Sequence, residues 1–318
     1  MTNIVFMGSP QFAVPTLETL ARDHHIVAVY TQPDKPAGRG KVLTAVPVKV
    51  WAEAHNIPIH QPKSFRKDPT AIDTLRALQP DVIIVAAYGL ILPQAVLDIA
   101  PFGCLNVHAS LLPRHRGAAP ISAAILAGDE VTGITIMQLD AGMDTGPMLS
   151  VARETIRPDD TTASLSERLS KLGAELMADT LPKYLRGEIM PQPQPEDGVT
   201  YCPKIDKADA QIDWNRSAAE IDRMVRAYTP WPGAFTWWND QMVKVLKVEV
   251  RSNELEVRSQ RVGQVLKLAD GSIGAVTSAG VLVLKEIQLA GRKALKTEDF
   301  VRGQPSFINS QLTLHNSQ

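Results

Sequence analysis

DVIIVAAY, residues 81–88, is the stretch of this chain that decides the fold class. The run is apolar without alternation, which is typical of a strand buried on both faces of a parallel sheet. Four further runs have strand patterns: NIVFMG (3–8), HIVAVYT (25–31), GCLNVHA (103–109) and GITIMQL (133–139). Helices are expected between them at residues 9–23, 45–56, 69–80, 121–128 and 161–187. This alternation predicts a doubly wound, Rossmann-like α/β domain.

The first strand–helix turn does not carry a nucleotide-binding fingerprint. A dinucleotide site needs Gly-x-Gly-x-x-Gly, but Gly8 is followed by SPQFA. The Gly-Lys-Ser/Thr of an ATP-binding loop is also missing from the sequence. Both NAD and ATP are therefore disfavoured, and Gly8 is expected to serve only a tight turn.

A proline-rich segment separates this first part from a tail with a different pattern. Residues 191–203 hold four prolines and show no periodicity, which indicates a linker that spans residues 189–206. After one helix (217–228), short strands are expected near 234–238, 242–250, 262–268, 273–277 and 281–288. The pattern predicts a small, OB-like β-barrel. The expected domains are therefore a catalytic domain (1–188) and a β-barrel (207–318).

Composition gives the expected class of protein. A length of 318 residues favours two domains, and 44% apolar with 21% charged residues is ordinary for a globular protein. The N-terminus has no basic leader, and no segment approaches the ~20 apolar residues of a membrane span. The two cysteines match no ligand or redox spacing. We expect a disulfide-free cytoplasmic monomer.

Asn106 and His108 are the first candidate site residues. They lie two positions apart in GCLNVHA, so in a strand they share one face. They also stand at the strand's carboxyl end, where open α/β sheets bind ligands. A zinc site would need further ligands at recognisable spacings, and a serine nucleophile would need an elbow motif that HASLLP lacks. For this pair alone, a structural and a catalytic role both remain open.

Asp144 supplies a third polar group. It lies between Gly142 and Gly146 in QLDAGMDTGPML (138–149), directly after another expected strand. An aspartate there can cap its own loop, or it can point into a cleft. Asn, His and Asp side chains converging at neighbouring strand ends would suit acyl-group transfer, with an amide that stabilises an oxyanion and a His–Asp pair that moves a proton.

These motifs resemble the folate-dependent formyltransferase family, in NVHASLLPRHRGAAP (106–120) and GMDTG (142–146). Further segments narrow the likeness to members that act on methionyl-tRNA: VFMGSPQFAVPTLETL (5–20), TQPDKPAGRGK (31–41), ITIMQLDAGMDTGPML (134–149) and QIDWNRSAAEIDRMVRAYTPWPGA (211–234). The resemblance implies transfer of a formyl group from 10-formyltetrahydrofolate to the α-amine of initiator methionyl-tRNA, for translation initiation, without a metal. It assigns oxyanion stabilisation to Asn106 and His108, and orientation of His108 with proton movement to Asp144.

The same resemblance implies two sets of binding residues. The folate pocket would be formed by Ser110, Leu111, Leu112, Pro113, Ile91, Leu92, Leu139 and Asp140. The acceptor stem of the tRNA would contact Lys35, Arg39 and Lys41 on a basic loop. The net charge of −1 does not itself indicate a nucleic-acid partner, but residues 207–318 carry 15 Lys and Arg against 12 Asp and Glu. A formyltransferase acting on a small amine, or an RNA-binding protein without activity, are the alternatives.

Overall fold

The computed structural model describes residues 1–37, 42–251 and 260–314. The chain forms two compact units, which we describe separately. Unit 1 consists of Met1–Ile121, Glu130–Ile156 and Leu165–Pro203. Unit 2 consists of Ser122–Asp129, Arg157–Ser164 and Lys204–Gln318. The domain boundaries expected from the sequence stay predictions.

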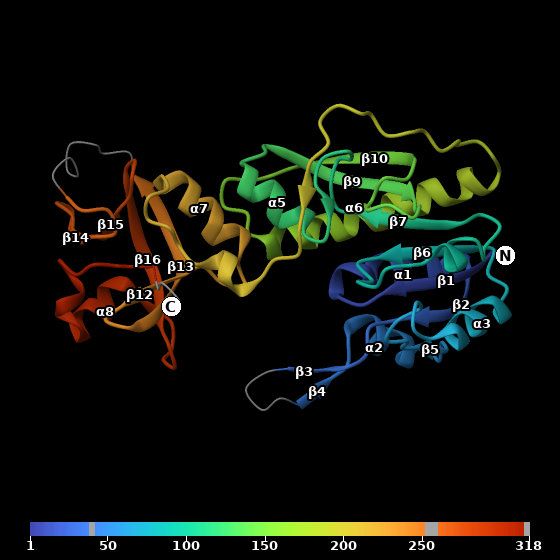
Figure 1. The fold of residues 1–318 in the computed structure, drawn as a ribbon, viewed down its shortest axis with the longest axis horizontal. Coiled ribbons are helices and arrows are strands. Elements are labelled where there is room, and N and C mark those ends of the chain that lie inside the picture. The colour runs from blue at the N-terminus through green and yellow to red at the C-terminus, as the bar shows by residue number, and fades with distance from the viewer. Residues whose placement is uncertain (38–41, 252–259, 315–318) are drawn as a thin grey trace. The chain divides into compact units, whose positions relative to one another are not determined.

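Unit 1 is built on a seven-stranded sheet with the order β10-β9-β7-β6-β1-β2-β5 (Figure 1). Five strands are parallel: β1 (Asn3–Gly8), β2 (His25–Tyr30), β5 (Ile59–His60), β6 (Val82–Ala86) and β7 (Cys104–His108). Of the last two strands, β9 (Val131–Gln138) pairs antiparallel to β7, and β10 (Met148–Thr155) pairs antiparallel to β9. The apolar run 81–88 contains β6, all of whose residues are buried, at the centre of the sheet.

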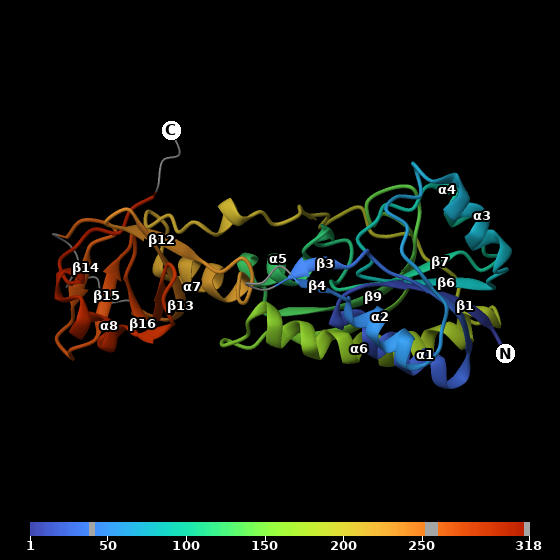
Figure 2. The ribbon, with the colours of Figure 1, turned by 90° about the horizontal axis from the view of Figure 1, so that it is seen from below.

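Helices cover both faces of this sheet (Figure 2). On one side lie α1 (Val14–Asp23), α2 (Pro47–Ala54) and α6 (Thr162–Leu185), and on the other α3 (Pro69–Ala77) and α4 (Gln94–Leu97). The short helix η1 (Gln11–Ala13) precedes α1, whereas α5 (Pro120–Ala127) starts in unit 1 and lies mostly in unit 2. Pro15 stands in the first turn of α1, where its missing N–H costs no hydrogen bond. A Cβ at Gly8 would lie 2.8 Å from the Ala86 carbonyl oxygen, so this glycine serves close backbone packing.

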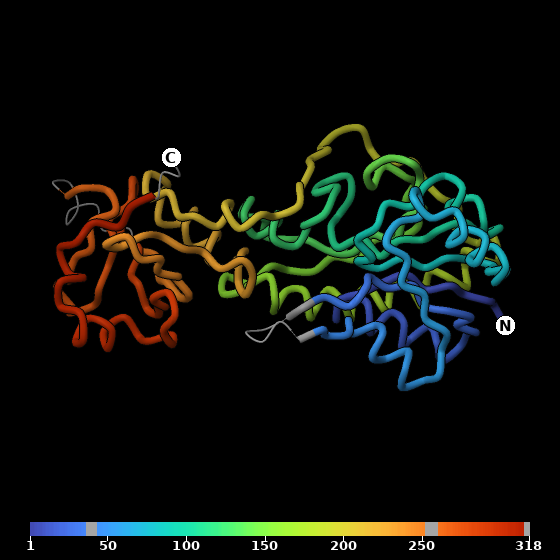
Figure 3. Tube along the Cα trace, turned by 60° about the horizontal axis from the view of Figure 1, so that its bottom comes forward, coloured from blue at the N-terminus to red at the C-terminus, as the bar shows by residue number. Residues whose placement is uncertain are grey.

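Two small strand pairs extend unit 1. The hairpin β3 (Lys35–Ala37) and β4 (Val42–Thr44) projects from the region of β2 and α2 (Figure 1). The second pair is parallel and joins β8 (Arg116–Gly117) to β11 (Tyr201–Cys202). To reach β11, the chain turns back after α6 and passes the β10 edge of the sheet, as Figure 3 also traces.

Unit 2 contains a six-stranded antiparallel sheet that curls into a half-barrel. Its strands are β12 (Phe235–Trp238), β13 (Gln241–Arg251), β14 (Val265–Lys267), β15 (Ile273–Val276), β16 (Val281–Leu289) and β17 (Leu295–Lys296). The helices of this part are η2 (Lys207–Ala210), α7 (Ala218–Ala227), α8 (Thr297–Gly303) and η4 (Pro305–Phe307). Ser217 and Glu220 form a capping box that starts α7.

The end of the chain joins the outer strands of the half-barrel. Thr313 forms an antiparallel bridge to Trp237 in β12, and Gln311 bridges to Gln264 next to β14. The predicted fold class, a Rossmann-like domain followed by a small β-barrel, is confirmed. Within the described ranges, no helix combines the length and apolar character needed to cross a membrane.

Candidate active site

The strand β7 presents Asn106 and His108 on one face. A Cβ at Gly173 in α6 would lie 2.7 Å from Cγ1 of Val107, so Val107 faces α6. Asn106 and His108 flank Val107 and therefore face away from α6. His108 is only 4% exposed, and Asn106 is half-buried. The Asn106 side-chain amide makes no hydrogen bond with the residues that the structure describes.

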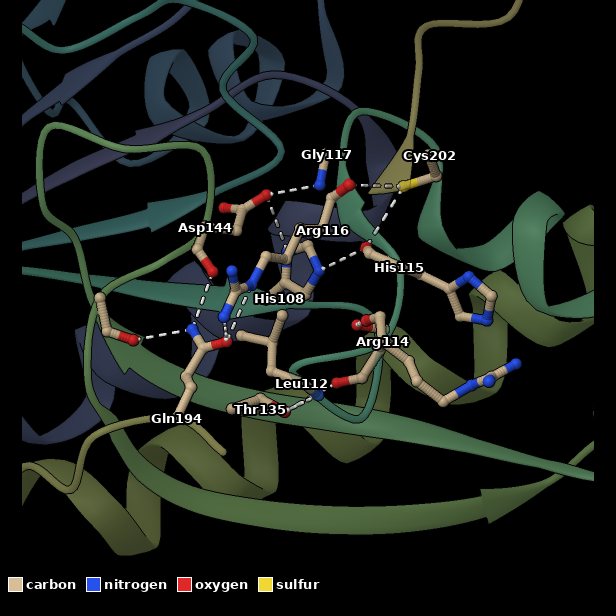
Figure 4. Close-up of polar contacts among 12 residues, drawn as sticks. His108, Leu112, Arg114, His115, Arg116, Gly117, Thr135, Asp144, Gln194 and Cys202 are labelled. Carbon is tan, nitrogen blue, oxygen red and sulfur yellow. Dashed lines mark hydrogen bonds and ion pairs between the residues drawn. The ribbon is translucent and has the colours of Figure 1, made fainter. Parts of the chain in front are cut away.

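Both ring nitrogens of His108 have a neighbour (Figure 4). Its Nε2 lies 3.1 Å from the carbonyl oxygen of His115, and its Nδ1 lies 3.6 Å from Oδ2 of Asp144. A carbonyl oxygen can only accept, so Nε2 carries a hydrogen. Burial lowers the pKa of His108 below its usual value, although the Asp144 carboxylate opposes this effect. The ring is therefore neutral at pH 7, with its unprotonated Nδ1 facing Asp144.

Asp144 reaches His108 by a route that the sequence pattern did not indicate. We expected side chains to meet at the ends of neighbouring strands, but β9 runs antiparallel to β7 and pairs Gln138 with Leu105. The chain therefore leaves β9 near the start of β7, and residues 139–147 return toward His108. Asp144 has a left-handed φ of 52°, and its Oδ2 accepts a 2.8 Å hydrogen bond from the Gly117 N–H.

Gln194 holds the loop that carries Asp144. Its Nε2 donates hydrogen bonds to the carbonyl oxygens of Asp144 and Gly146, both at 2.8 Å. Its Oε1 accepts from Nε and Nη2 of Arg116 at 3.0 and 2.7 Å (Figure 4). Sequence reasoning missed this residue, since it lies in the proline-rich segment expected to be a linker. Its partners in the loop are backbone carbonyls, which every residue has, so no sequence pattern indicates these contacts.

The β8–β11 pair supports the other neighbour of His108. The Thr200 hydroxyl accepts from the His115 N–H at 2.8 Å, and the Cys202 thiol donates to the His115 carbonyl oxygen at 3.2 Å. Burial raises the pKa of the Cys202 thiol, which favours its protonated, donating form. Gly117 has a φ of 125°, and a Cβ there would collide with the Cys202 carbonyl oxygen. Only glycine fits at this position.

The Ser-Leu-Leu-Pro loop follows His108 and is held by hydrogen bonds. The Ser110 hydroxyl donates to the Arg114 carbonyl oxygen at 2.6 Å. The Leu112 N–H donates to the Thr135 hydroxyl at 3.1 Å, and that hydroxyl donates to the Ser110 carbonyl oxygen at 2.7 Å. Leu112 and Pro113 are buried, and Leu111 is half-buried. The loop conformation is thus set by contacts to β9.

The other expected folate residues lie in three different environments. Ile91 is 67% exposed, whereas Leu92 and Leu139 are half-buried and pack on the same apolar cluster between the sheet and α3 and α4. Asp140 is exposed and accepts hydrogen bonds from the Gly142 N–H and the Thr145 hydroxyl, so it caps its own loop. Ile91 therefore exposes most of its apolar surface, whereas the cluster covers part of Leu92 and Leu139.

Of the expected tRNA-binding residues, Lys35 is exposed at the start of β3. Arg39 and Lys41 lie outside the described residues. In the part of the chain that the structure covers, no group of three or more His, Cys, Asp and Glu side chains could hold a metal ion.

Comparison with known proteins agrees with this architecture. The formyl transferase family matches residues 2–181, and the formyl transferase C-terminal domain matches residues 204–305. The methionyl-tRNA formyltransferase of Hydrogenovibrio crunogenus is 47% identical over 302 residues, which cover 95% of this chain and 96% of that protein. The methionyl-tRNA formyltransferase of Citrifermentans bemidjiense is 47% identical over 301 residues, covering 94% of this chain and 93% of that protein.

Solved structures share the fold at low identity. HypX from Aquifex aeolicus, in complex with tetrahydrofolic acid, has a TM-score of 0.61 at 19% identity, over 96% of this chain and 47% of that one. Methionyl-tRNA formyltransferase from Clostridium thermocellum has a TM-score of 0.55 at 16% identity, over 80% of this chain and 96% of that one. The chain therefore belongs to the formyl transferase family, and its full-length relatives place it among the methionyl-tRNA formyltransferases.

Proposed function

We propose that this protein transfers the formyl group of 10-formyltetrahydrofolate to the α-amino group of initiator methionyl-tRNA, for translation initiation. The observation that carries the proposal is the buried His108, held between a backbone carbonyl and the Asp144 carboxylate beside the half-buried amide of Asn106. Relatives named for this reaction match the chain in both of its domains.

The reaction forms a bond between the amine nitrogen and the formyl carbon, and breaks the bond between that carbon and N10 of the folate. One proton must leave the amine, and one must reach N10. His108 Nδ1 and Asp144 Oδ2 lie 3.6 Å apart, so a proton bound by one of them lies next to the other. Because the Nε2–H of His108 is directed at the His115 carbonyl, Nδ1 is the nitrogen available for this exchange. The pair can therefore take up the proton that leaves the amine and deliver a proton to N10 of the folate.

Asn106 is suited to stabilise charge on the formyl oxygen. Its amide is half-buried on the same face as His108 and makes no hydrogen bond with any described residue, so its N–H groups are available to a ligand. A preorganised donor of this kind acts on charge that develops during acyl transfer. The donor folate supplies the formyl group, and the apolar side chains of Ile91, Leu92 and Leu139 would contact its pterin.

The expected partners extend this proposal. Lys35, Arg39 and Lys41 would contact phosphates of the tRNA acceptor stem, since basic side chains that contact phosphates position a nucleic acid without reading its sequence. The region 207–318 would add a supporting tRNA surface through its surplus of Lys and Arg over Asp and Glu. A cytoplasmic location and a monomeric state belong to the same proposal.

Labelled formyl transfer tests the activity directly. The protein is mixed with 10-formyltetrahydrofolate carrying a labelled formyl group and with initiator methionyl-tRNA, and label in the aminoacyl ester is measured. Free methionine, uncharged tRNA and a nucleotide-linked amino sugar serve as control acceptors. We expect label in methionyl-tRNA alone. Label in the amino sugar instead would favour a small-amine formyltransferase, and tRNA binding without transfer would favour an RNA-binding protein.

The tRNA contacts are tested by neutralising the basic loop. Changing Lys35, Arg39 and Lys41 to Gln together should raise KM for methionyl-tRNA and leave folate binding unchanged, because the changes remove phosphate contacts only. The expected rise should shrink as salt is added. A KM equal to that of the unchanged protein at low salt would refute this role of the loop.

A further inference from the structure

We propose that Gln194 is a positioning residue for formyl transfer, which sets the Asp144 carboxylate against His108. This inference rests on the proposed function of the site. Gln194 itself touches neither His108 nor the Asp144 carboxylate in Figure 4; it acts through the backbone of the loop and through Arg116.

The imidazole does not hold Asp144 in place by itself. The separation of 3.6 Å between His108 Nδ1 and Asp144 Oδ2 is too long for a hydrogen bond. Asp144 also has a left-handed backbone, which a residue other than glycine adopts at a cost. Its position must therefore be set by other contacts, and the structure provides two: the Gly117 N–H on the carboxylate and the Gln194 amide on the backbone.

Gln194 links the two segments that supply the neighbours of His108. One segment carries Asp144, and the Gln194 amide donates hydrogen bonds to the carbonyl oxygens of residues 144 and 146, on both sides of Thr145. The other segment carries His115, and Gln194 binds the guanidinium of the next residue, Arg116, which is only 9% exposed. A single amide therefore connects the carboxylate side and the carbonyl side of the imidazole.

The backbone around Gln194 is held independently of its side chain. Gln192 forms an antiparallel bridge with Met148, in which each N–H donates to the other's carbonyl oxygen at 2.7 and 2.8 Å. Further along, β11 pairs with β8. Removing the Gln194 amide should therefore leave this segment in place and loosen only the Asp144 loop.

Two substitutions of Gln194 separate its contacts. Gln194→Glu keeps an acceptor for Arg116 but loses the N–H groups that reach both carbonyls. Gln194→Met has a similar length and loses all four hydrogen bonds. Gln192→Ala is the matched control, because the exposed Gln192 side chain bonds only to the Met190 carbonyl in its own segment. All variants are assayed as full-length proteins, with the concentration of each substrate varied while the other is saturating.

We expect both Gln194 variants to lower kcat roughly 10- to 100-fold, since a misplacement of about 1 Å can cost that much. KM for methionyl-tRNA and for the folate should stay within about twofold, and the unfolding midpoint in urea should match that of Gln192→Ala. The acid limb of the kcat–pH profile should also move to lower pH in Gln194→Met. Burial lowers the pKa of His108 and the Asp144 carboxylate raises it, so a carboxylate that moves away leaves that pKa lower still.

Three outcomes would overturn the inference. Values of kcat within twofold of the unchanged protein would show that the amide is not needed. Parallel losses of kcat, folate affinity and unfolding midpoint would show a general structural role. An unchanged pH profile together with a reduced kcat would show that Gln194 does not act through the His108–Asp144 pair. If neither the unchanged protein nor Gln192→Ala formylates methionyl-tRNA, the proposed function itself is refuted.

Discussion

Asp144→Asn is the change that tests the site most directly, because the structure predicts loss of chemistry without loss of fold. The Asn Oδ1 can accept the 2.8 Å hydrogen bond that Oδ2 of Asp144 receives from the Gly117 N–H. Asparagine also tolerates the left-handed φ of 52° at this position. A charged hydrogen bond becomes a neutral one, which costs about 1 kcal/mol.

A loss of about 1 kcal/mol is small beside the roughly 5–15 kcal/mol that hold a typical domain folded. The effect on the reaction should be much larger, because an amide oxygen cannot hold a proton at pH 7. General acid–base catalysis contributes roughly 100- to 10,000-fold, so kcat should fall by a factor in this range. That factor corresponds to about 3–5 kcal/mol in the activation free energy.

The assay combines three measurements on one variant: labelled formyl transfer at saturating methionyl-tRNA, equilibrium dialysis of a folate analogue, and urea unfolding. Asp179→Asn serves as the control, since Asp179 is exposed on α6 and pairs with Lys183. We expect kcat to collapse in Asp144→Asn alone, with folate affinity unchanged. If Asp144→Asn retains a kcat within threefold of the control while remaining folded, the proton role of Asp144 is refuted.

Three further predictions follow from the same contacts. Gly117→Ala should destabilise the protein by about 1–3 kcal/mol in urea and lower kcat, because its Cβ meets the Cys202 carbonyl at a φ that favours glycine; an unchanged unfolding midpoint would contradict this. NMR titration, with the His108 signal assigned from the spectrum of His108→Gln, should give a midpoint below 6.5, since burial lowers the pKa of His108. Because the folded state then binds fewer protons than the unfolded state, this histidine lowers the free energy of unfolding as pH falls from about 6.5 toward its folded pKa. His108→Gln should remove this dependence of stability on pH, and a titration midpoint above 6.5 for His108 would refute the neutral ring. Finally, His108→Ala combined with Asp144→Asn should lose no more activity than the worse single change, as expected for residues that act as a unit, whereas additive losses would show separate roles.

The parts of the fold that the sequence predicted are those where burial follows a local pattern. The unbroken apolar run at 81–88 became the central strand β6, and the helix expected at 161–187 became α6 over Thr162–Leu185. The strand β10 was not anticipated, since it lies at the sheet edge, where three of its eight residues are exposed and none is fully buried. Strand direction was also hidden, because alternation of side chains is the same in parallel and antiparallel strands.

The candidate site divides along a similar line. Asn106 and His108 could be placed on one face because their spacing matches the period of a strand. The contacts of Asp144 with Gly117, and of Gln194 with the Asp144 loop, could not be predicted, since each joins a side chain to backbone groups of a distant segment. Proline-rich composition further concealed Gln194, because a tract without periodicity gives no sign of what its side chains contact.

His108 and Asp144 must therefore be considered together rather than as separate acid and base. The His115 carbonyl fixes the hydrogen of the neutral imidazole on Nε2, and that leaves Nδ1 as the basic nitrogen. Nδ1 faces a carboxylate oxygen 3.6 Å away, and the charge of that carboxylate favours a proton on the imidazole. Since Gln194 and Gly117 set the distance within this pair, the backbone of two remote segments determines how readily the site takes a proton from the amine and gives one up.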